Sequence, residues 1–163
     1  MKELLFLRHA KSAWEWPVED RNRPLAPKGI NAITCVAHHW EARFKSFDAI
    51  YTSSAIRALH TATILAHEIE FKLLNFFVNH NLYTFNAKAV ISEVKALDDT
   101  MRKVIFVGHN PAFSLAADYF SATVVPELKT ADWIHLNFSQ TTWKEVTKGK
   151  ATLGSKKEAL KKS

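Results

Sequence analysis

The sequence lacks the features of a disulfide-stabilised or membrane-spanning protein. It contains one cysteine, Cys35, which excludes an internal disulfide framework and CxxC chemistry and favours a reducing cytoplasm. The first apolar run, residues 4–7, is too short for a signal-peptide core, and no later run reaches the roughly 18 residues of a membrane span. We therefore expect a soluble cytoplasmic protein without a membrane partner.

Glycine and proline are also scarce, with four and five residues among 163. Hydrophobic residues make up 47% of the chain and aromatic residues 12%, which is typical of a globular protein and excludes fibrous and disordered classes. The length suits one domain with a single core.

The net charge of +6 is concentrated at one end of the chain. Residues 148–163 carry six lysines and one glutamate, a net charge of +5, whereas the other 147 residues together carry +1. A basic surface for nucleic acid is therefore not indicated. We predict one domain over residues 1–147 and a solvated, basic C-terminal tail over residues 148–163.

Short apolar runs alternate with segments of helical periodicity along the chain. We predict strands at residues 4–7, 48–53, 76–78, 103–107 and 133–138, with a further strand at 143–146. Helices are predicted at residues 30–45, 54–69, 90–97 and 112–120. This alternation predicts a three-layer α/β/α sandwich with a mainly parallel sheet.

Three predicted strands end in polar signatures. Arg8 and His9 follow the first, Arg57 comes soon after the second, and His109 follows the strand at 103–107. Because the carboxyl ends of parallel strands share one edge of a sheet, we expect these side chains to meet there.

Arginines and histidines at one point indicate phosphate chemistry. Arginine presents a planar fork of donors that matches a phosphate and stays charged. A neutral imidazole is a nucleophile, so His9 would attack phosphorus while His109 donates to the phosphoryl oxygens.

The segments LFLRHAKSAW, SSAIRALHTA and VGHNP resemble the signatures of the histidine phosphatase superfamily, and in particular of its small SixA-type phosphohistidine phosphatases. The matches occur in the family's order and span residues 4–146. The resemblance implies a phosphohydrolase that needs no metal or other cofactor and forms a covalent phosphohistidine on His9. It makes Arg8 and Arg57 phosphate ligands, His109 the group that stabilises the transferred phosphoryl, and Arg23 of the RPL segment a further arginine of the pocket.

The chain departs from the family pattern at two places. Ser53 and Ser54 stand where serine and proline are usual, and we expect this to alter loop stiffness only. Asn81 stands where many relatives have a glutamate, and an amide cannot donate the proton that an alkoxide leaving group needs. A phosphoramidate such as phosphohistidine depends less on such a donor, although Glu15, Glu19 or Asp20 of the first loop remain alternative acids.

Phosphohistidine in a protein, or a small phosphoramidate, is therefore the expected substrate. Two alternatives stay open: a broad phosphatase of small phosphomonoesters, and a binding module that recognises phosphate with little catalysis. The other histidines show no metal-ligand spacing, so no metal site is expected. Oligomeric state is not indicated by the sequence.

Overall fold

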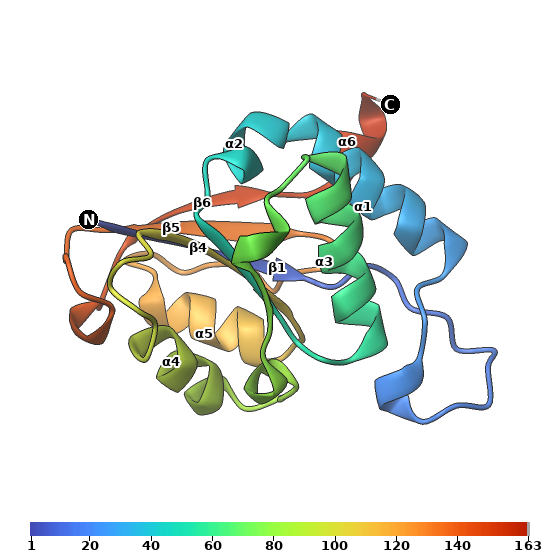
Figure 1. The fold of residues 1–163 in the computed structure, drawn as a ribbon, viewed down its shortest axis with the longest axis horizontal. Coiled ribbons are helices and arrows are strands. Elements are labelled where there is room, and N and C mark those ends of the chain that lie inside the picture. The colour runs from blue at the N-terminus through green and yellow to red at the C-terminus, as the bar shows by residue number, and fades with distance from the viewer. Residues whose placement is uncertain (163) are drawn as a thin grey trace.

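The computed structural model describes residues 1–162, which form a six-stranded sheet covered by helices on both faces (Figure 1). The strands are β1 (Lys2–Arg8), β2 (Ala49–Thr52), β3 (Phe76–Val78), β4 (Lys103–Gly108), β5 (Trp133–Phe138) and β6 (Lys150–Gly154). Their order is β3-β2-β4-β1-β5-β6, and only β5 runs against the others. The expected α/β/α sandwich with a mainly parallel sheet is confirmed.

Six helices make the outer layers. They are α1 (Pro27–His39), α2 (Glu41–Lys45), α3 (Ile56–Glu68), α4 (Ala87–Lys95), α5 (Ala112–Phe120) and α6 (Lys156–Lys161). Residues of α1, α2, α3 and α6 pack on one face of the sheet, and those of α4 and α5 pack on the other. In Figure 1, α1, α2 and α6 lie above the strands and α4 and α5 lie below them.

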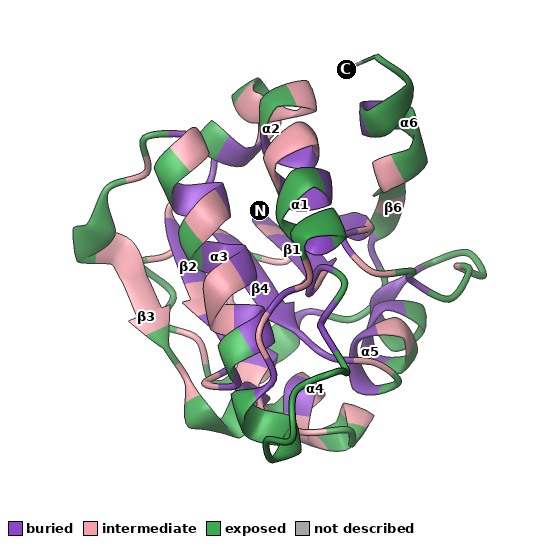
Figure 2. Cartoon of the chain, turned by 90° about the vertical axis from the view of Figure 1, so that its right-hand side faces the viewer, coloured by how far each residue is buried: buried purple, intermediate pink, exposed green. Residues whose placement is uncertain are grey.

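Strand β1 is central because its side chains are apolar on both faces. Leu5 and Leu7 belong to the core cluster under α1 and α3, and Leu4 and Phe6 belong to the cluster under α4 and α5. All four side chains are fully buried. The central strands accordingly stand out as buried in Figure 2, while the edge strand β3 is only partly covered.

The predicted helix over residues 30–45 proved to be two helices. Pro27 begins α1, where its fixed φ angle and missing N–H suit the first helical turn. Trp40 leaves the helical conformation at φ −117° and ψ 29°, which separates α1 from α2.

The prediction of a solvated tail was wrong for most of residues 148–163. Strand β6 pairs with β5 in antiparallel register, and α6 packs against α1 with Ala159 in the core. The prediction failed because five of the six lysines are exposed although the segment is folded. Lys156 is half-buried, and its Nζ donates to Thr130 Oγ1 at 2.6 Å. The strand predicted at residues 143–146 was also wrong, since Trp143–Glu145 form a 3-10 helix with the indole buried.

Gly154 is a glycine because Trp133 lies directly against it. A Cβ atom at this position would stand 2.1 Å from Cε2 of the indole. This contact between Gly154 and Trp133 holds the end of β6 against β5.

Gly154→Ala is therefore expected to destabilise the protein by about 1–3 kcal/mol, the usual cost of overpacking. Urea unfolding followed by fluorescence measures the change. Lys150→Ala, at an exposed position of the same strand, is the control and should change stability by less than about 0.5 kcal/mol. Equal stability of Gly154→Ala and the unsubstituted protein would show that this packing does not contribute.

Candidate functional site

The five residues expected to act on phosphate line one cavity of about 330 Å³. They are Arg8, His9, Arg23, Arg57 and His109. The sheet brings them together because His9 N donates to Gly108 O at 3.0 Å and Ser53 N donates to Val107 O at 2.9 Å. The remaining lining residues are Lys11, Ser12, Trp14, Asp20, Phe85, Asn110 and Thr130.

His9 presents an unprotonated nitrogen to this cavity. Its Nδ1 lies 2.7 Å from Ala10 O, and Arg57 Nε lies 3.3 Å from its Nε2. Since a carbonyl oxygen only accepts and a guanidinium only donates, Nδ1 carries the proton and Nε2 carries the lone pair. Burial, together with the charges of Arg57 and Arg8, lowers the pKa of His9 to about 4, although the hydrogen bond to Ala10 opposes the change.

His109 faces His9 with a distance of 5.2 Å between the ring centroids. Its Nε2 lies 2.7 Å from Ser53 Oγ. Burial, followed by the influence of His9 and Arg57, lowers the pKa of His109 to about 3. Both imidazoles are therefore neutral at physiological pH. Ser53, which the sequence suggested only as a loop residue, orients His109.

Thr61 of α3 is hydrogen-bonded to the segment that follows β1 and carries His9. Thr61 Oγ1 accepts from Ala10 N at 3.0 Å and donates to Arg57 O at 2.7 Å. Arg57 lies in the first turn of α3 and is only 2% exposed. The contacts of Thr61 thus join the segments that carry His9 and Arg57, a link that no sequence pattern indicated.

Arg8 and Arg23 are held by other partners at the cavity wall. Arg8 Nη1 donates to Leu128 O at 2.8 Å, and Arg23 Nη1 donates to Ser12 Oγ at 2.6 Å. The Arg23 guanidinium also lies 3.5 Å from the centroid of the Trp14 ring. These contacts fix the directions of guanidinium groups that would otherwise sample many rotamers.

Asp20 is the anion among these cations. Its Oδ2 accepts from Arg57 Nη2 at 3.0 Å and from the Tyr83 hydroxyl at 2.8 Å, and its Oδ1 accepts from Arg23 Nη2 at 3.0 Å. Burial by itself would raise the pKa of Asp20, but the hydrogen bonds from Tyr83 and Arg23 and the charge of Arg57 lower it to about 2. The carboxylate is ionised in this state.

Asn81 lies away from the cavity. Its Nδ2 donates to Glu93 Oε1 at 2.9 Å, and Asn79 Nδ2 donates to the other oxygen of Glu93 at 2.7 Å. Glu15 and Glu19 do not line the cavity in the described part of the chain. Of the three acids considered from the sequence, Asp20 is the one at the site.

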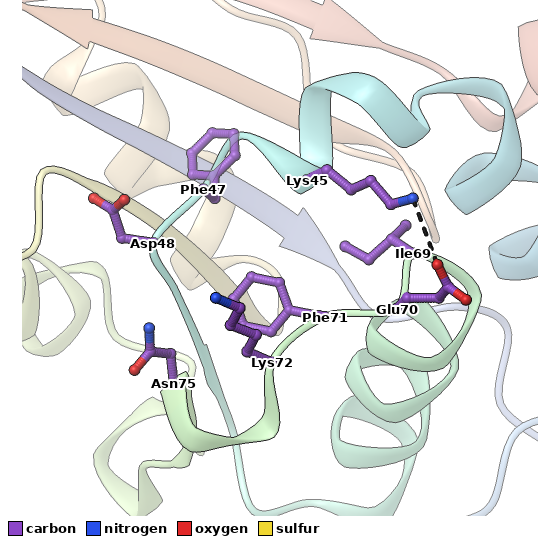
Figure 3. Close-up of a pocket in the computed structure, with 8 residues that line it drawn as sticks. All are labelled: Lys45, Phe47, Asp48, Ile69, Glu70, Phe71, Lys72 and Asn75. Atoms are coloured by element: carbon purple, nitrogen blue, oxygen red, sulfur yellow. Dashed lines mark ion pairs between the residues drawn. The ribbon is translucent and has the colours of Figure 1, made fainter.

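A larger cavity, of about 510 Å³, lies at the amino ends of β2 and β3 (Figure 3). Lys45, Asp48, Glu70 and Lys72 contribute both signs of charge, and Lys45 pairs with Glu70 at 4.0 Å. No histidine lines it. Its balanced charges do not suit a phosphate, so the smaller cavity is the candidate site.

Residues 1–162 contain neither a group of potential metal ligands nor a membrane-spanning helix. Within that range, no three His, Cys, Asp or Glu side chains are grouped so that they would hold a metal ion. In the same residues, no helix combines the length and apolar character that a membrane crossing requires.

Comparison with known proteins identifies the family. Residues 4–82 match the model of the histidine phosphatase superfamily, branch 1. An uncharacterised protein of Mycobacterium tuberculosis is 31% identical over 111 residues, which cover 68% of this chain and 67% of that protein. An uncharacterised protein of Mycobacterium leprae is 28% identical over 115 residues, covering 68% of each chain.

The chain belongs to the histidine phosphatase superfamily. Its fold is that of a protein histidine phosphatase SixA solved with tungstate, with a TM-score of 0.77, 15% identity and 94% of each chain covered. It also matches the mycobacterial glucosyl-3-phosphoglycerate phosphatase, with a TM-score of 0.66, 14% identity and coverage of 94% of this chain and 97% of that one. The superfamily expected from the three motifs is confirmed.

The buried histidines of this histidine phosphatase make its stability depend on pH. His9 and His109 have pKa values of about 4 and about 3, and burial also lowers the pKa of His135. In the unfolded chain each imidazole takes up a proton below about pH 6.5. The unfolded state then binds more protons than the fold does, so the free energy of unfolding is expected to decrease as pH falls from about 6.5 to 4.

Urea unfolding at several pH values in that window measures this slope. Removing one such histidine with His109→Gln should reduce the slope by up to about 1.4 kcal/mol per pH unit, which corresponds to one proton. His67→Ala, at an exposed position, should leave it unchanged. A free energy of unfolding that does not vary with pH between 6.5 and 4 would contradict the prediction. Asp20 adds to the decrease at the lower end of this window. Its pKa in the fold is about 2, so its contribution to stability is lost progressively from about pH 5 downward as the unfolded carboxylate takes up a proton.

Proposed function

We propose that the protein hydrolyses phosphohistidine in a protein, or a related phosphoramidate, through a phosphorylated His9. The observation that carries the proposal is the orientation of His9, whose unprotonated Nε2 faces the arginine-lined cavity. Phosphatase activity is the function supported by the family and by the phosphatases that share the fold.

The reaction begins with attack of His9 Nε2 on phosphorus. The P–N or P–O bond to the leaving group breaks as the new P–N bond to His9 forms. Arg8, Arg23 and Arg57 would bind the phosphoryl oxygens, and His109 would stabilise the charge that shifts onto them in transfer. Water then attacks the phosphohistidine, releasing inorganic phosphate and restoring neutral His9. We propose that the protein's own residues suffice, without a metal or cofactor.

The substrate class is supported by the openness of the cavity. Trp14 and Phe85 line it and are 71% and 53% exposed, so its mouth is uncovered. Between β1 and α1 only residues 9–26 are available to cover it. An open mouth suits a phosphorylated side chain on a protein surface.

We also propose that the protein acts in the cytoplasm. Cys35 is free, which agrees with the reducing cytoplasm expected from the sequence. The partner would be a phosphorylated protein or a small phosphorylated molecule, and neither nucleic acid nor membrane is invoked.

His9→Ala is expected to reduce turnover of a phosphohistidine peptide and of phosphoramidate to the background rate, because no nucleophile remains. Initial rates without added metal, measured by phosphate release, test this. His67→Ala should retain full activity, since His67 is exposed. Turnover that persists in His9→Ala would refute the phosphohistidine intermediate. An unsubstituted protein that binds inorganic phosphate but turns over no substrate would favour the binding module.

A further inference from the structure

We propose that Asp20 donates the proton to the leaving oxygen of phosphomonoesters, which makes their hydrolysis a further activity of this pocket. This inference rests on the proposed function, because it uses the same phosphorylated His9. It supplies the proton donor that Asn81 cannot be.

The guanidinium group of Arg57 contacts both Asp20 and the nucleophile His9. Arg57 donates to Asp20 Oδ2 through Nη2 at 3.0 Å and to His9 Nε2 through Nε at 3.3 Å. A phosphoryl group attacked by His9 and bound by Arg57 therefore lies beside the Asp20 carboxyl. Asp20 is the only carboxylate that lines the cavity in the described residues.

The contacts of Asp20 explain how it can change from base to acid. Three groups donate to it: Arg57 of α3, Arg23 of the first loop and Tyr83 after the 3-10 helix at His80–Leu82. A bound phosphate dianion takes the two arginines as ligands and adds negative charge next to the carboxyl. Both changes favour the protonated carboxylic acid.

Two further cations, Arg8 and Lys11, line the cavity with Asp20 and would also face a bound phosphate. His9 and His109, at the ends of β1 and β4, are neutral above about pH 4 because burial lowers their pKa values. Arg8 lies on the same cavity but donates to Leu128 O. A bound phosphate dianion offsets these cations and makes the surroundings of Asp20 more negative, which favours its protonated form.

The lone pair of His9 Nε2 forms the P–N bond while the P–O bond to the leaving group breaks. The proton of the Asp20 carboxylic acid moves to the departing oxygen, which leaves as an alcohol. Asp20, now a carboxylate, takes a proton from the water that hydrolyses phospho-His9, and inorganic phosphate departs.

Asp20→Asn tests the proton donor, because asparagine keeps the size and can still accept from Arg57 and Tyr83. The rate on a serine phosphomonoester should fall by about 10²–10⁴, the usual contribution of a general acid. The rate on p-nitrophenyl phosphate, whose leaving group needs no proton, should fall less than about tenfold. The decrease of the serine-phosphate rate on the alkaline side of the pH profile should disappear in the variant.

Two further variants are the controls. Glu19→Gln, at an exposed residue next to Asp20, should leave both rates unchanged. Asp20→Glu restores a carboxyl group and should recover part of the serine-phosphate rate together with the alkaline decrease.

Equal losses on the two substrates in Asp20→Asn would overturn the proposal and leave Asp20 as a positioning residue for the arginines. It would also be overturned if the unsubstituted protein cleaved phosphoramidate through His9 but no monoester. If that protein turned over no substrate at all, the proposed function itself would fail.

Discussion

The need to compensate buried guanidinium groups governs the structure around the cavity. Arg57 is 2% exposed and Arg23 is 7% exposed, and both lie at the end of a sheet whose strands are otherwise apolar. A cation in such a place is costly unless an anion and hydrogen-bond acceptors surround it. Here Asp20 supplies the anion, and Ser12 and the Asp20 carbonyl supply further acceptors. A phosphate dianion satisfies the same guanidinium groups, which is why an anion-binding pocket and a stable fold are compatible.

The same positive environment sets the state of the histidines. Burial together with neighbouring arginines keeps His9 and His109 neutral, and the bond from His9 Nδ1 to Ala10 O leaves Nε2 as the nucleophilic atom. The pocket therefore depends on three strand ends that are held in register. Pairing of β1 with β4 joins the two histidine segments, and Ser53, which follows β2, contacts the His109 ring.

The sheet centre and the catalytic motifs were predictable because their causes are local. Residues 4–7 are apolar without alternation, which is typical of a strand covered on both faces, and the polar residues after it mark the carboxyl end. The basic terminus was mispredicted because composition does not say which positions are buried. Gly154 and Ala159 make the close contacts, while five of the six lysines of this segment are exposed. The role of Trp40 in ending α1 had no signal as strong as a glycine or proline.

The sequence also could not show which acidic residue of the first loop lies at the cavity. Glu15, Glu19 and Asp20 are similar in type and close in the chain, and only the direction of the first loop separates them. That direction follows from long-range contacts with Arg57 and Tyr83. Likewise, the pairing of Asn79 and Asn81 with Glu93 turns the expected acid position away from the cavity, a consequence of tertiary structure.

The central claim is that a phosphoryl group passes through His9. Its most direct test is to mix the protein with a phosphoramidate, denature it within the first turnover under alkaline conditions, and locate the phosphate by peptide mass spectrometry. The account predicts up to one phosphoryl group per chain, on the peptide that contains His9 and absent from His9→Ala. A phosphoryl group on any other residue would contradict it.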